Sequence, residues 1–406
     1  MTQKLTIIGG GLVGASLACA LRPLDLDVTV LEETPLESGA QPSFDERTIA
    51  MTYGSRKILE AIGIWDLIAP EAGDIKRIHV SNRGHAGFTR LDRNDIGTEA
   101  LGYVVPTRAI GKALIDELHR SPKINFQCPS RAEQIHISPA SNNVTTETTD
   151  GAVSSSLVVL ADGGRSPATT MIGVNKKIKK YSESALVGIV GVDRNHNGTA
   201  FERFTEYGPL ALLPLVNQGF ALAWTLPEHD AQAMTALPTE EFLSLLQDSF
   251  GDRAGFFTAC NQLTTYPLSQ VEIESPVSNR CVAVGNAAHI VHPVAGQGFN
   301  LGLKDIAYLS EAIAKATLEN ADIGDTSFLQ RYATTRRDQT RRVLRFTDGL
   351  LQLFANELPG LRVARNIGLN LIEIIPPAKR FLLRRTVGIA GPLPRLARGL
   401  PLQPQS

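Results

Sequence analysis

Residues 5–14 read Leu-Thr-Ile-Ile-Gly-Gly-Gly-Leu-Val-Gly, and this stretch decides the fold. Its apolar first half predicts a buried strand, and the small residues of 15–21 predict a helix that stops before Pro23. Residues 27–31 predict a second strand, which ends at an acid, Glu32. Strand, glycines, helix, strand and terminal acid in this order are typical of a Rossmann-type dinucleotide-binding unit.

Each glycine of this unit has a separate steric task. Gly9 permits the sharp turn after the strand, and Gly11 lets a pyrophosphate approach the backbone. Gly14 lets the helix pack closely on the strand. Glu32 can accept hydrogen bonds from a ribose diol. We therefore expect these four residues to bind a nucleotide cofactor.

A second glycine-rich loop follows the predicted strand 282–284 and precedes a helix that begins near Asn300. Pro293, Gly296 and Gly298 fall within six residues, so the backbone can turn sharply and expose amide groups. The first amides of the following helix have no partner within the helix and favour an anion. A tight turn that needs its glycines only for steric reasons is the alternative.

Two further residues are candidate cofactor ligands. Asp162 ends a buried strand at 157–161 and is followed by two glycines, so it can hydrogen-bond a cofactor while the backbone passes close by. An ordinary strand-ending turn would have the same composition. Arg47 precedes a predicted helix and can clamp a phosphate, although a solvated surface arginine is the alternative.

The middle of the chain predicts an antiparallel sheet inserted between nucleotide-binding segments. Four strands are expected at 186–192, 200–205, 210–215 and 220–225, and a hairpin at 75–88. Large apolar residues of these strands either wall a substrate pocket or form core: Phe201, Phe204, Tyr207, Leu212, Leu213 and Trp224.

The composition is that of a soluble protein able to bury a large core, with 406 residues and 43% hydrophobic content. Its four cysteines lack CxxC spacing, so neither a disulfide framework nor a metal site is indicated, and a reducing compartment is expected. The glycines at 9–11 interrupt any secretory signal. No apolar run reaches the roughly 18 residues of a membrane-spanning helix.

The net charge of −1 conceals a basic C-terminal region. From Arg331 onward there are 14 arginines and lysines against 4 acids, a balance of +10. Three helices are expected at 341–355, 362–375 and 378–389, each combining Leu/Ile faces with arginines. Such helices either lie in a membrane interface or cap the body with their arginines in water. A peripheral membrane contact is expected, and no nucleic-acid partner.

These motifs resemble the class A flavoprotein aromatic monooxygenases, and more narrowly the ubiquinone-biosynthesis hydroxylases. The resemblance rests on residues 9–14, on Asp162-Gly163, on Gly285-Asn286-Ala287-Ala288-His289 and on residues 292–302. It covers nearly the whole chain. The wider family usually has Asp where this chain has Asn286; an amide keeps an acceptor oxygen, so cofactor binding is expected to survive.

The resemblance implies FAD as the tightly bound cofactor and NAD(P)H as a transient reductant. Helix amides at 296–300 suit a flavin ring that becomes anionic on reduction, which favours FAD over NAD. The expected cofactor residues are Gly9, Gly11, Gly14, Glu32, Arg47, Asp162, Gly285, Asn286, Gly296, Gly298 and Asn300. His292 and Pro293 are expected beside the ring at the substrate pocket.

The implied reaction is ring hydroxylation of a polyprenylated phenol, 2-polyprenyl-6-methoxyphenol, with O2 and a flavin C4a-hydroperoxide. A cytoplasmic enzyme attached peripherally to the inner membrane is expected, with an assembly of ubiquinone-biosynthesis proteins as a further partner. The alternatives are a sister hydroxylase that attacks another ring carbon, a hydroxylase of soluble phenols, and a non-catalytic prenyl-binding protein on the same scaffold.

The expected domain organisation is discontinuous. Residues 1–75, 106–180 and 276–335 are expected to form the FAD-binding domain, and residues 76–105 and 181–275 the substrate domain. Residues 336–406 form the basic, apolar helical segment.

Overall fold

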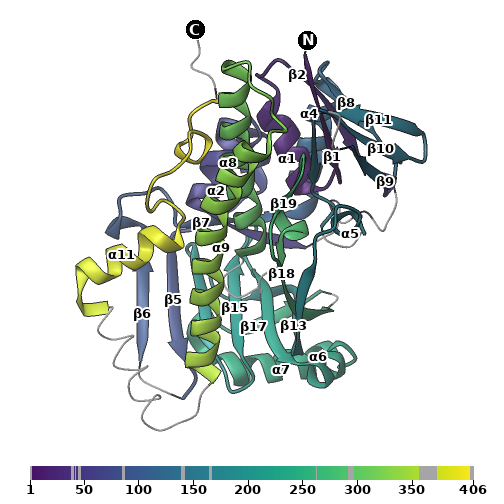
Figure 1. Cartoon of the computed structure of the whole chain (residues 1–406). Helices are drawn as coiled ribbons and strands as arrows, with labels where there is room; N and C mark the ends of the chain where they lie inside the picture. Colours follow the sequence, from purple (N-terminus) through teal and green to yellow (C-terminus); the bar gives the residue numbers. More distant parts are fainter. Residues whose placement is uncertain are drawn as a thin grey trace.

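The computed structural model describes residues 2–37, 41, 43, 47–84, 87–138, 142–163, 167–261, 263–290, 297–355 and 373–402. Within these ranges the chain forms a parallel sheet with helices on one face and, below it in Figure 1, a large, mostly antiparallel sheet. The predicted α/β fold with an inserted antiparallel sheet is confirmed.

The parallel sheet carries the nucleotide-binding motifs. Its strand order is β19 (Val277–Ser278), β20 (Cys281–Ala283), β12 (Leu157–Leu160), β1 (Gln3–Ile8), β2 (Leu26–Leu31) and β8 (Ile124–Gln127). All neighbours are parallel except β19 and β20. Because parallel strands end at the same edge, the loops after β1, β2, β12 and β20 are brought together there.

Consecutive residues of β1 and β12 face different layers. Ile7 and Val159 belong to the core formed with α1 (Leu12–Leu21), α4 (Thr107–Arg120) and α8 (Gln297–Leu318). Ile8 and Leu160 pack with a second core under the sheet β9 (Ala132–Ile137), β10 (Val144–Thr148), β11 (Gly151–Ser155) and the helix α5 (Ala168–Met171). Burial on both faces explains the unbroken apolar runs in these strands.

A small sheet connects the two large ones. It consists of β3 (Thr48–Thr52), β7 (Gly102–Pro106) and β4 (Gly73–Ile75), and β3 leads directly into α2 (Tyr53–Ala61) and then α3 (Trp65–Ile68). Thr52 caps α2 by accepting a hydrogen bond from the Ser55 amide.

The antiparallel sheet has nine strands within the described residues. Its order is β21 (His289–Ile290), β18 (Thr264–Ile273), β13 (Lys176–Val192), β16 (Phe220–Pro227), β15 (Pro209–Pro214), β14 (Thr199–Phe204), β5 (Arg77–Asn82) and β6 (Phe88–Asp92), with β17 (Phe257–Cys260) paired to β13. Only β14 and β5 pair in parallel. The four predicted strands are present, and β13 begins ten residues before the predicted start at 186.

One face of this sheet is closed by two helices, α6 (Glu228–Thr235) and α7 (Thr239–Phe250). Phe242, Leu246 and Phe250 of α7 pack against Leu212 and Trp224 of the sheet. Trp224 and Leu212 are therefore core residues, which was the alternative to a place in the wall of a substrate pocket.

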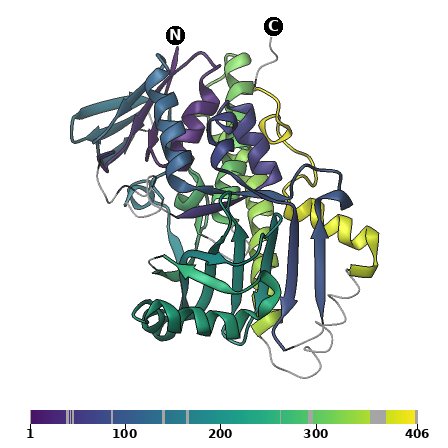
Figure 2. The same ribbon diagram turned by 180° about the vertical axis from the view of Figure 1, so that it is seen from behind.

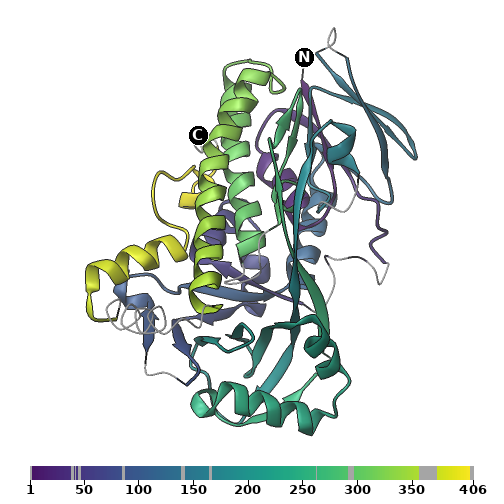
Figure 3. The ribbon, with the colours of Figure 1, turned by 60° about the horizontal axis from the view of Figure 1, so that its bottom comes forward.

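The C-terminal part begins with two long helices that lie side by side, α8 and α9 (Thr326–Ala355). Figure 3 shows this pair beside the parallel sheet, and Figure 1 shows α9 continuing down to the antiparallel sheet. The helix expected at 341–355 is the second half of α9. The expected domain limit between residues 335 and 336 falls inside this helix, which runs continuously along both parts of the molecule.

The last helix, α11 (Pro376–Thr386), lies beside β5 and β6, which Figures 1 and 2 show from opposite sides. Its bounds agree in part with the expected helix at 378–389. Most of the helix expected at 362–375 lies outside the described residues. No helix in the described ranges has the length and apolarity that a membrane span requires.

Candidate functional site

The site lies at the carboxyl edge of the parallel sheet, where three loops meet. Gly9 has φ +103°, and a Cβ atom there would lie 2.6 Å from the Ala161 carbonyl oxygen and 2.7 Å from the Cα of Asp162. On the other side, a Cβ on Gly285 would lie 3.0 Å from a methyl carbon of Val13. The loops after β1 and β12 are therefore in contact through their backbones, and the loop after β20 packs against the Val13 side chain in the first turn of α1.

The first turn of α1 is open to a ligand. A Cβ on Gly14 would overlap the carbonyl oxygen of Gly9, so a glycine is required for the helix to pack this closely. Around Gly11 the nearest atom of the described residues to such a Cβ is the Ser43 hydroxyl, 3.9 Å away. No side chain caps the helix. Its first amides are free of intrahelical partners, and no closer described atom stands beside Gly11, which suits a phosphate.

Glu32 organises the glycine loop. One carboxylate oxygen accepts a hydrogen bond from the Gly10 amide at 2.8 Å, and the other accepts one from the Thr34 amide at 2.9 Å. Gln41 donates a longer bond of 3.4 Å to the same carboxylate. The acid thus fixes the loop and keeps lone pairs at the sheet edge for a further donor.

Arg47 joins the small sheet to the antiparallel sheet. Its carbonyl oxygen accepts a hydrogen bond from the Thr107 amide at 2.8 Å, and its guanidinium lies 5.2 Å from the centre of the Tyr266 ring. The side chain therefore points toward the antiparallel sheet and is not a freely solvated surface arginine.

A buried ionic cluster supports the third loop. Asp305 of α8 accepts hydrogen bonds from the Gly285 amide at 2.9 Å, from His289 Nε2 at 2.8 Å and from Arg336 Nε at 2.7 Å. The three side chains are at most 4% exposed. Burial raises the pKa of Asp305, but the charges of Arg336 and His289 and the hydrogen bonds outweigh it and lower the pKa to about 2.

The sequence interpretation did not identify Asp305 and Arg336. The signal for Asp305 is present, since it lies four residues after Leu301, inside the apolar stripe of the helix, where an unpaired acid would be costly. Arg336 is 31 residues further along, and no local pattern connects the two. His289 bonds to the Asp305 carboxylate, which also accepts the Gly285 amide, so the histidine supports this loop through Asp305.

Asn300 turns its side chain away from the glycine loop. Its amide oxygen accepts hydrogen bonds from the Thr52 amide at 2.8 Å and the Ser55 hydroxyl at 2.6 Å. Its amide nitrogen donates to the Ala50 carbonyl at 2.9 Å. The residue clamps the start of α8 to the junction of β3 and α2, so only its backbone remains for a ligand.

Asn286 and Gly298 lie close to each other on the two sides of the third loop. Asn286 is exposed, and its side-chain oxygen lies 3.9 Å from the position of a Cβ on Gly298 in the first turn of α8. The other three expected residues, His292, Pro293 and Gly296, lie outside the described residues. Within the described residues, the first turns of α8 and α1 and the amide side chain near α8 together fit an elongated dinucleotide such as FAD.

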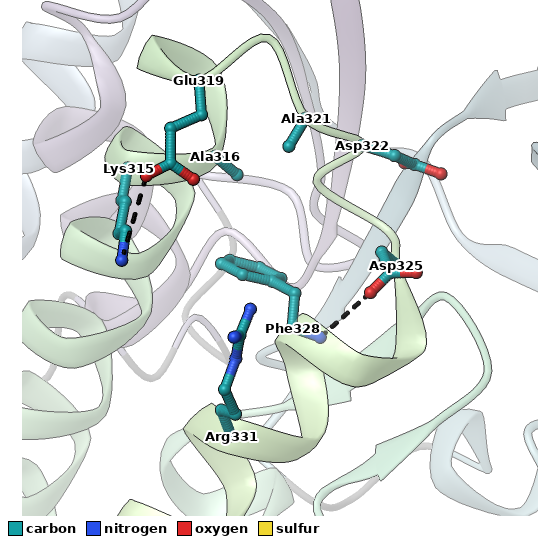
Figure 4. Close-up of a pocket in the computed structure, with 8 residues that line it drawn as sticks. All are labelled: Lys315, Ala316, Glu319, Ala321, Asp322, Asp325, Phe328 and Arg331. Carbon is teal, nitrogen blue, oxygen red and sulfur yellow. Dashed lines mark hydrogen bonds and ion pairs between the residues drawn. The ribbon is translucent and has the colours of Figure 1, made fainter.

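A pocket of about 220 Å³ lies elsewhere, at the far end of α8 (Figure 4). Its wall contains Lys315, Glu319, Asp325 and Phe328, and Lys315 and Glu319 pair across its rim. With about 1.5 Å of rise per residue, α8 separates this pocket from the glycine loop by about 30 Å. The pocket is therefore unrelated to the cofactor loops.

The chain matches the model of a protein family described as an FAD binding domain over residues 1–347. It is 34% identical to the ubiquinone hydroxylase UbiL of Rhodospirillum rubrum, over 98% of this chain and 92% of that protein. It is 27% identical to the 3-demethoxyubiquinol 3-hydroxylase of Escherichia coli, over 95% and 98%. The crystal structure of p-nitrophenol 4-monooxygenase PnpA from Pseudomonas putida superposes with a TM-score of 0.77 at 20% identity, covering 95% of this chain and 98% of that one.

Proposed function

The chain belongs to the FAD binding domain family and is an FAD-dependent monooxygenase, and from this premise we propose that it hydroxylates the ring of a polyprenylated phenol in ubiquinone biosynthesis. The observation that carries the proposal is similarity over nearly the full length to two proteins named as hydroxylases of ubiquinone or demethoxyubiquinol. We propose 2-polyprenyl-6-methoxyphenol as the substrate, because residues 81–88 and 200–210 resemble the hydroxylases of that phenol.

The proposed roles of the cofactor residues follow from the open positions at the sheet edge. The amides at Gly11 and Gly14 would hold the pyrophosphate, and Glu32 the adenosine ribose. Asn286 would bind a ribityl hydroxyl, and the first amides of α8 would stabilise negative charge on the flavin ring.

Bound FAD supplies the redox chemistry by taking a hydride from NAD(P)H and activating O2 for transfer of one oxygen atom. The protein has to bind the phenol against the ring and exclude water from it. We propose that His292 and Pro293 border this pocket. The expected domain division remains part of the proposal, with α9 shared between the cofactor part and the helical segment.

We further propose that the enzyme works at the membrane surface, where a polyprenylated phenol would reside. Ile374 and Phe381 at α11 are 73% and 63% exposed, and Arg380, Arg384 and Arg385 stand on the same helix. Apolar side chains that enter the headgroup region and arginines that meet anionic lipid are the elements of an interfacial helix. This would place the enzyme on the cytoplasmic side, within reach of other ubiquinone-biosynthesis proteins.

Flotation with anionic liposomes tests the membrane proposal. Phe381→Asp should reduce the bound fraction several-fold. The control is Leu67→Asp, which changes a 50% exposed leucine on α3. Equal binding of wild type, variant and control would contradict an interfacial role for α11.

Turnover tests the catalytic proposal. The purified protein should carry the absorption of oxidised flavin, which NADPH bleaches faster when a short-chain prenylated methoxyphenol is present. Product analysis should show one added oxygen on the ring. Hydroxylation at another ring carbon would indicate a sister hydroxylase, and preference for an unprenylated phenol would indicate a soluble-phenol hydroxylase. A flavin-free protein that binds the prenyl chain would indicate the non-catalytic alternative.

A further inference from the structure

One row of side chains crosses seven strands of the antiparallel sheet in register. Directly paired residues project from the same face of a sheet, so each link of the row can be followed through the strand pairing. The row contains, in order across the sheet, Thr264, Val187, Ala223, Ala211, Glu202, Val80 and Thr89. Glu202 is the only charged residue in it.

This row lies on the face opposite α6 and α7. The alternate residues Leu186, Leu212 and Trp224 project to the other face and belong to the core with α7. Two residues from Val187 along β13, Ala185 pairs with Tyr266, against which Arg47 packs. The row therefore belongs to the face that the cofactor-binding part of the chain approaches.

The centre of the row is open and lined by short side chains. Val80, Ala211 and Ala223 are each partly exposed, whereas Leu186, Leu212 and Trp224 of the α7 face are buried. Alanines beside a valine leave room above the sheet that larger side chains would fill. Such a surface suits a flat aromatic ring and an apolar tail.

Glu202 has no hydrogen-bond or ion-pair partner within the described residues. Burial alone raises its pKa to about 7, with no charged group contributing. Its directly paired neighbours, Val80 and Ala211, are apolar. The adjacent Arg203 projects to the opposite face, where it lies over the Phe250 ring. Glu202 itself is half-buried, like the short side chains beside it. A half-buried carboxylate without a partner is costly, so its presence in an apolar row points to a ligand that supplies one.

We propose that Glu202 binds the hydroxyl group of the phenol substrate and accepts its proton during hydroxylation, an inference that rests on the proposed function. The phenol O–H bond breaks and a carboxyl O–H bond forms on Glu202. The electron pair stays on the phenolate oxygen and raises the electron density of the ring carbon that receives the oxygen atom. When the ring carbon has lost its own proton to solvent, Glu202 returns its proton to the product oxygen.

The altered acidity of Glu202 fits this task. A free phenol has a pKa near 10 and an ordinary glutamate one near 4.3, so an ordinary carboxylate is a weak base toward a phenol. A pKa of about 7 removes roughly half of this difference. Because the pKa is raised, the carboxylate is competent above pH 7 and becomes protonated below it.

The test compares Glu202→Gln and Glu202→Asp with the control Glu206→Gln. Glu206 lies in the exposed turn after β14, where it pairs with Arg83 at the surface. Single-turnover hydroxylation of a short-chain prenylated methoxyphenol is measured from pH 6 to pH 10. The wild-type rate should rise with an apparent pKa near 7. Glu202→Gln should be slower by about 100-fold at pH 8, the size of a general-base effect, and recover toward pH 10, where the phenol ionises unaided.

Two further readouts separate proton transfer from a structural effect. A ring-fluorinated, more acidic phenol should recover much of the Glu202→Gln rate, and Glu202→Asp should retain part of the wild-type rate. Phenolate absorbance on binding at pH 8, which needs no turnover, should appear with wild type and Glu206→Gln and be absent with Glu202→Gln. FAD content verifies that each variant is folded.

The outcomes are distinct. A wild-type pH profile and phenolate absorbance in folded Glu202→Gln, or in Glu202→Asp if the first variant does not fold, would overturn the role of Glu202. Wild-type protein that forms phenolate but no hydroxylated product would overturn the proposed function and leave phenol binding by Glu202 supported.

Discussion

Replacing Asp305 with asparagine should destabilise the protein strongly, because the side chain is the common partner of three buried groups. The substitution keeps the size and one acceptor oxygen but removes the charge. The lowering of the Asp305 pKa from 3.8 to about 2 corresponds to about 2 kcal/mol in favour of the charged form. Arg336, 3% exposed, would also lose its counter-ion, and breaking a buried ion pair costs about 3–5 kcal/mol. We expect a loss of about 2–5 kcal/mol in the free energy of unfolding.

Urea unfolding of Asp305→Asn, Arg336→Met and the double variant measures this loss and its origin. The double-mutant cycle should give a coupling free energy of at least about 2 kcal/mol. The control is Asp116→Asn, which removes an exposed pair with Lys112 and should cost less than about 1 kcal/mol. Since the pKa is depressed, the advantage of wild type over Asp305→Asn should be complete above about pH 4 and shrink as the pH falls toward 2. Additive single losses, or a loss no larger than that of Asp116→Asn, would refute the reasoning.

Three further substitutions test the other contacts that hold the loops and helix starts of the candidate site. Glu32→Ala frees the Gly10 and Thr34 amides and should weaken FAD binding about tenfold or more, measured by flavin fluorescence titration, while unchanged affinity would contradict the role of this acid. Gly14→Ala forces a methyl group into the carbonyl of the preceding loop and should lower stability by about 1–3 kcal/mol or prevent folding. Gly349→Ala in α9, where no described atom comes within 4 Å of the added methyl group, should be neutral or stabilising in the same thermal melts. Asn300→Ala leaves the Thr52 amide without its partner and should cost about 1–3 kcal/mol in urea unfolding; equal midpoints would show that the clamp is dispensable.

The parallel sheet was predictable because its signals are local. A strand buried on both faces is apolar at nearly every position, and the turn after it needs glycines at fixed spacing. Residues 5–14 therefore predict both the strand and the turn, without information from distant parts of the chain. The strands of the antiparallel sheet were found for a similar reason, from their alternation and the turns between them.

The candidate site was predictable only in part. Glu32 and Asp162 could be predicted as candidates because each ends a recognisable strand. Asn300 was expected to serve the cofactor through its helix amide; its side chain bonds to residues about 250 positions earlier, and no local pattern records that contact. Glu202 lies within a stretch that resembles the hydroxylases. Its proposed role as a proton acceptor, however, depends on the residues that pair with it across the antiparallel sheet, which the sequence does not give.

The sequence by itself determined the α/β class, the glycine loops and the FAD family, since these depend on the chemistry of short segments. Only the tertiary structure decided that the carboxylate of Asp305 has an ionic partner and that the carboxylate of Glu202 has none among the described residues. Asp305 meets Arg336 and is held charged, while the directly paired neighbours of Glu202 are apolar and leave it without an ionic partner. Along the chain each acid stands next to one basic residue in an otherwise apolar stretch, and their difference arises from partners that folding brings near or keeps away.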